Sequence, residues 1–149
     1  LALQRGHTPV RVQVKPSLGN RIVWKTVYET ADRYYVDAVR PFPDGRVYAG
    51  ASLPVLDAAR AFPWLTEGSR QARDLERFRW FSDGFVARSD EHPNRVIDVR
   101  YSMVPNRIEG LWAIELDQDA PPDAHVRYLT DRDDPRAAAH ILWDMIFGG

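Results

Sequence analysis

The order in which two hydrophobic periodicities follow one another is the feature of this 149-residue chain that most constrains its fold. Residues 10–15 alternate strictly between apolar and polar side chains, which is typical of a strand with one buried face. Strand-like segments recur on both sides of a helical middle, at residues 22–29, 34–39, 46–49, 85–87, 95–103, 111–117 and 124–129. Short turns predict a hairpin early in the chain and a meander late in it. The sequence therefore predicts a curved, mostly antiparallel sheet.

The longest helix is predicted at residues 67–82 and ends at Asp83-Gly84. Its apolar residues recur at every third position, as expected of an amphipathic helix: Ala72, Leu75, Phe78 and Phe81. A shorter helix is predicted at residues 54–60. A closing helix begins after Asp134-Pro135, with aspartate as N-cap and proline at the first helical position. Its apolar face is made of Ala138, Ile141, Leu142 and Met145.

Strands, helices, strands and a last helix follow one another in an order that indicates an α+β fold rather than a doubly wound parallel sheet. We expect the sheet to pack against the long central helix and the C-terminal helix. Residues 1–149 are expected to form a single soluble domain. No stretch approaches the roughly 20 apolar residues that a membrane-spanning helix needs.

Composition excludes several classes of function. With 20 basic and 21 acidic residues, the chain has no global field that would attract nucleic acid. The absence of cysteine excludes disulfides, thiolate zinc sites and cysteine nucleophiles. The four histidines lie too far apart for a zinc signature: His7, His92, His125 and His140. No nucleophile elbow or phosphate-binding glycine loop occurs either, so the sequence identifies no catalytic residue, metal ligand or cofactor in this chain.

The best candidate for a binding site is a group of charged residues on the late strands. A register that keeps the apolar side chains together places Arg100 near Glu115, with Asp98 one step along. Arg127 projects from the following strand, and Trp112 belongs to the same stretch of sheet. These five residues form the predicted ligand-binding set.

This set of residues has three interpretations. A carboxylate–guanidinium cluster in a cleft could hold an anionic or polar ligand, or a protein partner. The favoured interpretation is a solvated sheet face with cross-strand ion pairs. Each such pair contributes a few tenths to about 1 kcal/mol to stability. The third is a small hydrolase, in which Asp98, Glu115 and His125 converge as acid–base groups or metal ligands.

Aromatic residues cluster at the end of the long helix. Phe78 and Phe81 are expected to face inward, whereas Trp80 points elsewhere. Trp80 then lies against a neighbouring part of the chain, which is the favoured interpretation, or against a partner or a membrane surface. Trp64 is open to the same alternatives, as a core residue or an exposed contact.

Several segments resemble the carboxyl-terminal region of membrane-bound metal-dependent hydrolases, which are bacterial inner-membrane proteins. The resemblance runs from the start of the chain to about Leu129. The segments that carry it are Arg5-Gly6-His7, residues 10–16, Asn20, Trp24, residues 34–36, residues 77–84, residues 98–102 and residues 111–116. None of these segments is a catalytic signature.

The resemblance implies that this chain is the soluble accessory domain of such a hydrolase. In that family, the His and Asp residues assigned to the metal lie in amino-terminal membrane helices, to which nothing here corresponds. The divalent metal would then belong to the full-length protein, and this domain would follow the last membrane helix on the cytoplasmic side of the inner membrane. Residues 1–5 read as the end of an incoming helix, stopped at Gly6. The protein's own membrane region is then a partner of this domain.

Overall fold

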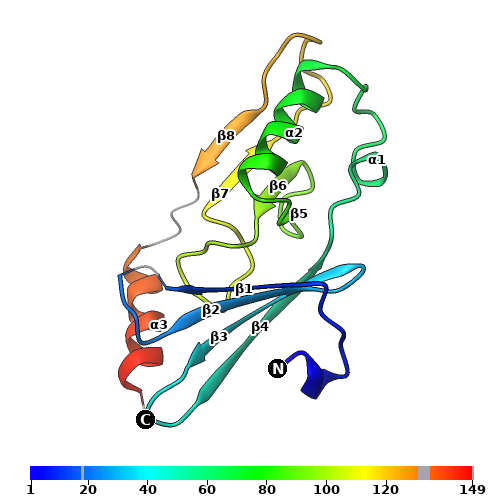
Figure 1. Ribbon diagram of the computed structural model, residues 1–149. Helices are drawn as coiled ribbons and strands as arrows, with labels where there is room; N and C mark the ends of the chain where they lie inside the picture. The colour runs from blue at the N-terminus through cyan, green and yellow to red at the C-terminus, as the bar shows by residue number, and fades with distance from the viewer. Residues whose placement is uncertain (18, 131–134, 149) are drawn as a thin grey trace.

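The structure is a computed structural model that describes residues 1–17, 19–130 and 135–148 (Figure 1). It contains two four-stranded antiparallel sheets and helices, which confirms the predicted α+β class. The first sheet has the order β1 (Arg11–Pro16), β2 (Trp24–Glu29), β3 (Arg33–Arg40) and β4 (Arg46–Pro54). The second has the order β5 (Val86–Arg88), β6 (Arg95–Asp98), β7 (Trp112–Glu115) and β8 (Arg127–Thr130). The helices are a 3-10 turn (Leu3–Arg5), α1 (Ala58–Ala61), α2 (Arg70–Phe81) and α3 (Pro135–Phe147).

All eight predicted strands are present, and they are divided between two sheets rather than joined in one. In Figure 1 the second sheet lies above the first, α2 crosses its front, and α3 stands beside one end of the first sheet. Several predicted boundaries are wrong; β8, for example, begins at Arg127 instead of residue 124. β4 continues to Pro54, so the short helix α1 begins only at Ala58, with Asp57 as its N-cap. β6 ends at Asp98 instead of continuing to residue 103.

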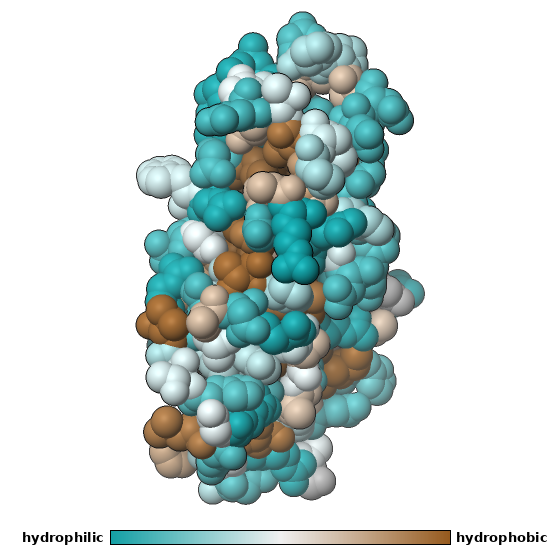
Figure 2. All heavy atoms as spheres, turned by 90° about the vertical axis from the view of Figure 1, so that its right-hand side faces the viewer, coloured by the Kyte–Doolittle hydropathy of each residue, from teal (hydrophilic) through white to brown (hydrophobic). Residues whose placement is uncertain are grey.

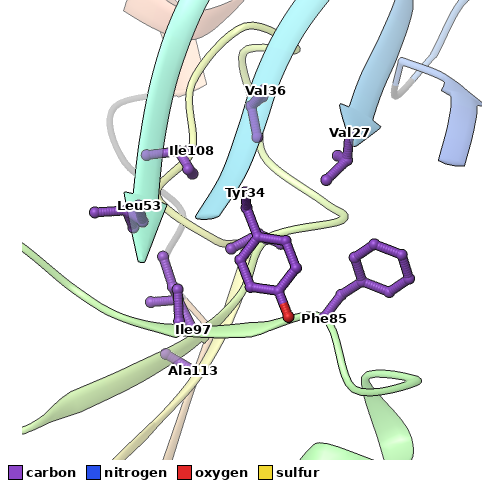
Figure 3. Close-up of a cluster of buried hydrophobic side chains, with 10 residues drawn as sticks. Val27, Tyr34, Val36, Leu53, Phe85, Ile97, Ile108 and Ala113 are labelled. Atoms are coloured by element: carbon purple, nitrogen blue, oxygen red, sulfur yellow. The ribbon is translucent and has the colours of Figure 1, made fainter. Parts of the chain in front are cut away.

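The two sheets enclose a common hydrophobic core. Side chains from β2, β3 and β4 point toward side chains from the second sheet and its loops (Figure 3). The cluster consists of Val27, Tyr34, Val36, Leu53, Phe85, Ala87, Ile97, Val99, Ile108 and Ala113. Tyr34 spans the interface, because its ring packs against Phe85 and its hydroxyl donates to the carbonyl oxygen of Gly84 at 2.9 Å.

The opposite face of the second sheet is covered by α2. Leu75 and Phe78 are buried there against Val96 and Ile114. The strands of this sheet are therefore apolar on both faces, as strands between two covering layers are. Gln71 and Asp74 are also buried on α2.

The helix α2 ends where its sequence predicts, but it begins at Arg70, three residues later than predicted. Ser69 is the N-cap, and its hydroxyl accepts a hydrogen bond from the backbone N–H of Ala72 at 3.2 Å. Asp83 and Gly84 follow the helix with φ angles of 51° and 75°. Aspartate and glycine tolerate this left-handed backbone better than most residues, which is why the chain turns here toward β5.

Residues 1–7 lie against the outer face of the first sheet. The 3-10 turn ends at Gly6, as predicted, with φ 73°. Arg5 forms two hydrogen bonds with the buried carboxylate of Asp37, at 2.7 and 2.8 Å, and His7 Nδ1 lies 2.9 Å from the hydroxyl of Tyr28. These contacts fix the start of the described chain to β2 and β3.

The closing helix α3 starts at Pro135, in agreement with the sequence; its predicted N-cap, Asp134, lies outside the described residues. Ala138 and Met145 are buried, with Ile141 and Leu142 packed around them, so the predicted apolar face is confirmed. Among the residues described, no helix has both the length and the apolar character needed to cross a membrane.

Candidate functional site

The strand register separates the charged residues that the sequence analysis placed together. In the structure, β6 pairs with β7 so that Arg95 lies opposite Glu115 and Ile97 lies opposite Ala113. The predicted proximity of Arg100 and Glu115 is therefore wrong. Because both faces of this sheet are buried, more than one register keeps apolar side chains inside, so the pattern of apolar residues did not determine the register.

Asp98 and Arg100 form a buried pair of their own. Asp98 is 0% exposed, and its carboxylate accepts hydrogen bonds from Arg100 Nε at 2.9 Å, Arg100 Nη2 at 2.7 Å and the backbone N–H of Arg100 at 3.0 Å. The last of these hydrogen bonds closes a local turn, and β6 ends at this turn. Arg100 Nη2 also donates to the carbonyl oxygen of Phe81 at 2.9 Å. The pair thus connects the end of β6 to the end of α2.

Glu115 and Arg127 lie at the other end of the sheet. They face each other across β7 and β8, and Arg127 Nη2 donates to Glu115 Oε2. Asp98 lies three positions beyond Arg95, the residue opposite Glu115, and this offset corresponds to about 10 Å along a strand. The predicted set is therefore divided into two ion pairs, with Trp112 beside the first.

His125, which the interpretation as a small hydrolase groups with Asp98 and Glu115, also lies elsewhere. Its Nδ1 is 2.7 Å from Oδ2 of Asp74 on α2, and the backbone N–H of Val126 donates to the same oxygen at 3.3 Å. Asp98, Glu115 and His125 consequently have three different partners and do not converge on one point. In the part of the chain that the structure describes, no group of three or more His, Asp or Glu side chains is arranged to hold a metal ion.

Lys25 is a buried cation that the sequence analysis did not identify. Only 4% of it is exposed, and its ammonium donates to Ser102 Oγ at 2.8 Å and to the carbonyl oxygen of Arg107 at 2.6 Å. Burial lowers the pKa of Lys25 to about 7, and the nearby charge of Asp98 acts in the opposite direction. This contact joins β2 of the first sheet to the loop that follows β6.

A cavity near these groups lies between the end of α2 and strands β7 and β8. It has a volume of about 460 Å³ and a largely apolar surface. The lining residues are Arg77, Phe78, Trp80, Phe81, Trp112, Ala113, Tyr128, Leu129 and Thr130. We refer to it as the aromatic cavity, since five of the nine side chains are aromatic.

Several of these aromatic rings are held by edge-to-face contacts. The ring of Trp112 meets that of Phe81 at a centroid distance of 6.0 Å and that of Tyr101 at 4.9 Å. Such contacts fix ring orientation. Arg100 also stabilises this region, because its guanidinium donates a hydrogen bond to the carbonyl oxygen of Phe81. The wall formed by Phe81 and Trp112 is therefore fixed in the absence of any ligand.

Other rings at the cavity are open to solvent. Trp80 is 84% exposed and Tyr128 is 60% exposed. The favoured interpretation of Trp80 as a packed residue is wrong, and so is the expectation that Phe81 faces fully inward, since half of it is exposed. Trp64, by contrast, is partly buried against Phe62 and belongs to the core.

A second hollow, of about 850 Å³, lies between α1 and α2 and also includes Arg77 and Trp80 in its lining. Figure 2 views the side of the molecule that carries α1, and its upper half shows hydrophobic atoms set between hydrophilic ones. Trp80 and Arg77 thus stand between two apolar hollows on either side of α2.

Only part of this site was predicted from the sequence. Trp112 was predicted as a ligand-binding residue, and contact with a partner was one of the alternatives for Trp80, whereas Tyr128 and Thr130 were not identified. A usable signal was present, because an alternating strand that begins at Arg127 places Tyr128 and Thr130 on one face.

Comparison with known proteins gives no further guide to this site: no family model, curated protein or solved structure matches the chain.

Proposed function

We propose that this chain is a binding domain and that its site is the aromatic cavity. The observation that carries the proposal is the set of exposed rings around a cavity of about 460 Å³. This volume lies within the range of small-ligand sites, and such sites are mostly apolar with a few polar groups. Leaving Trp80 and Tyr128 open to water is unfavourable, and a flat apolar group placed between them would remove that apolar area from solvent.

The charged residues of the predicted set do not line this cavity. Asp98 and Arg100 satisfy each other, and Glu115 and Arg127 do likewise. Of the predicted set, we therefore assign ligand contact to Trp112 alone, and Arg100 supports the cavity through its bond to the Phe81 carbonyl. Burial raises the pKa of the Tyr128 phenol, with the Asp74 carboxylate adding to the effect, so its hydroxyl is neutral and can donate a hydrogen bond.

We further propose that this is the accessory domain of a membrane-bound metal-dependent hydrolase, with the metal site in another part of the protein. The support is the resemblance described above together with the position of the cavity. Six of the nine lining residues fall within residues 77–84 and 111–116, two of the segments that carry the resemblance. The domain would then bind a substrate or partner for a catalytic centre in the inner membrane.

Replacing Trp80 with alanine should weaken the binding of 1-anilinonaphthalene-8-sulfonate, an aromatic anion whose fluorescence rises in apolar sites. Loss of one stacked ring corresponds to a roughly two- to tenfold increase in Kd. The unfolding midpoint should not change, because the side chain is 84% exposed. Trp143→Ala is the matched control, since Trp143 is an exposed tryptophan on α3. Equal losses in the two variants would show that the dye does not use the cavity.

The purified chain should not hydrolyse phosphoesters, carboxylesters or amides when Mg²⁺, Mn²⁺ or Zn²⁺ is added. This result is expected because Asp98, Glu115 and His125 are engaged with separate partners. Chromogenic substrates measured against metal-only blanks check it. Turnover that disappears in Glu115→Gln or His125→Ala would contradict the accessory role and restore the interpretation as a small hydrolase.

A further inference from the structure

We infer that the occupant of the aromatic cavity is a large apolar side chain of an extended, acidic peptide segment, which pairs through its backbone with the outer edge of β8. This inference rests on the proposed function, since it requires the cavity to be a binding site. Three features of the structure support it: an open strand edge, the position of α2 beside that edge, and the charge of the cavity lining.

The strand edge is the first feature. β8 is the last strand of its sheet, and β7 is its only strand partner among the residues described. Its residues are exposed except for Leu129, which is half-buried. A strand at the end of a sheet presents N–H and C=O groups to which a further strand can bind, and many peptide-binding domains use this arrangement.

The second feature is that the cavity opens beside this edge. Tyr128 and Thr130 lie two positions apart on the same face of β8, and both line the cavity together with Phe81 of α2. A strand added next to β8 places every second side chain on that face. One such side chain would therefore enter the space between α2 and the sheet, where Trp112 forms the inner wall.

The third feature is charge. Arg77 is the single charged residue in the cavity lining, and its side chain is 67% exposed. Its ion pair with Asp74 is long, at 3.4 Å, and the same carboxylate also binds His125 and the backbone N–H of Val126. A guanidinium has five N–H donors, so Arg77 can bind an additional carboxylate. An Asp or Glu near the anchoring side chain fits this position.

A peptide accounts for these features better than a small aromatic acid does. A small ligand would use the rings and Arg77, but it would leave the edge of β8 without a role. Main-chain pairing supplies affinity and the alternate side chains supply specificity in complexes of this type. The structure therefore favours an extended segment with an alternating pattern, in which a Trp, Phe or Leu lies close to an acidic residue.

The experiment starts from a phage-displayed library of random 12-residue peptides, selected on the purified chain. We expect enrichment of sequences that carry a large apolar residue with Asp or Glu within two positions. The consensus peptide is then synthesised, and its Kd is measured by tryptophan fluorescence and by calorimetry. Arg77→Glu should weaken it roughly tenfold or more. Arg73→Glu, one turn away on the exposed side of α2, should change it little.

Two further measurements test the binding mode. A peptide in which Lys replaces the acidic residue should bind Arg77→Glu better than wild type. Methylation of single backbone nitrogens should weaken binding at alternate positions only, because every second N–H of an added strand points to β8. Equal sensitivity at all positions would overturn the strand-pairing geometry.

The outcomes distinguish this inference from the proposed function. If the dye binds in a Trp80-dependent way but no peptide is enriched, the cavity is a small-ligand site and the inference is wrong while the proposed function stands. If neither the dye nor a peptide depends on Trp80, both are wrong. Trp80-dependent binding to vesicles of anionic phospholipid, with no peptide enriched, would identify a membrane surface as the occupant and also overturn the inference.

Discussion

Replacing Asp98 with alanine should lower the free energy of unfolding by about 3–5 kcal/mol, the usual cost of removing one partner of a buried ion pair. The carboxylate is 0% exposed and accepts hydrogen bonds from three N–H groups of Arg100, at the backbone nitrogen, Nε and Nη2. Its removal leaves the Arg100 guanidinium, whose side chain is 11% exposed, without a counter-charge. It also removes a negative charge that favours the protonated form of the buried Lys25. The β6 end and the loop after it should lose their fixed geometry.

Urea denaturation at pH 7 measures this effect. Glu76→Ala is the matched control, because Glu76 pairs with Arg79 on the surface of α2 at 3.5 Å. Exposed pairs of this kind contribute about 0–1 kcal/mol. Asp98→Asn keeps the shape and one acceptor oxygen, so it should fall between the two. The result also bears on the sequence-based interpretation of Asp98 as a ligand contact. An alanine variant of unchanged stability that no longer bound the consensus peptide would support that interpretation and contradict ours.

The fold was largely predictable because its local signals agree with one another. Alternation from residue 10 onward indicated β1, Asp83-Gly84 marked the end of α2, and Pro135 marked the start of α3. Each signal depends on the residues within one element, and its position agreed with the final structure. The buried face of β1 was predicted wrongly, because Val10, Val12 and Val14, the apolar residues of the alternation, are 66%, 58% and 54% exposed. The division into two sheets was not predictable, because it depends on contacts such as that between Tyr34 and Phe85, which are far apart in sequence.

The candidate site was predicted less well, for a reason that Val96 and Ile97 illustrate. Both are buried, one under α2 and the other against the first sheet. In a strand covered on both faces, alternation no longer distinguishes inside from outside. The alternation of Asp98 and Arg100 with apolar residues therefore suggested that the strand continues. In the structure β6 ends at Asp98, whose carboxylate binds the backbone N–H of Arg100.

Buried polar residues were the other source of error. Asp74 falls on the buried face of α2 with Gln71, Leu75 and Phe78, although an aspartate side chain is rarely fully buried. Lys25 is a charged residue between Trp24 and Thr26 in β2, a position that suggests a solvent-facing side chain, yet it faces the core. Such side chains are stable inside only when distant groups satisfy them. Ser102 and the Arg107 carbonyl do so for Lys25, and no pattern within β2 reveals them.

Lys25 makes the stability of the protein depend on pH, and this is the second large effect that we expect. Its pKa falls from the usual 10.5 to about 7 in the folded protein because burial penalises the charged form. Between these two values the unfolded chain binds more protons than the folded one does, so the free energy of unfolding must rise as pH increases. The difference between the two pKa values corresponds to about 5 kcal/mol at most.

A comparison with Lys25→Met isolates this contribution, because the remaining groups titrate in both proteins. We expect wild type to gain stability relative to Lys25→Met from about pH 7 to about pH 10, by up to about 1.4 kcal/mol per pH unit. Urea denaturation at half-unit intervals of pH measures the difference. Lys15→Met is the control, since Lys15 is the other lysine of the chain and should leave the wild-type profile in place. Parallel profiles for wild type and Lys25→Met would contradict the burial of a titrating ammonium. The Asp98→Asn variant adds a directional test: without the Asp98 charge, the rise should begin at lower pH, because that charge holds the proton on Lys25.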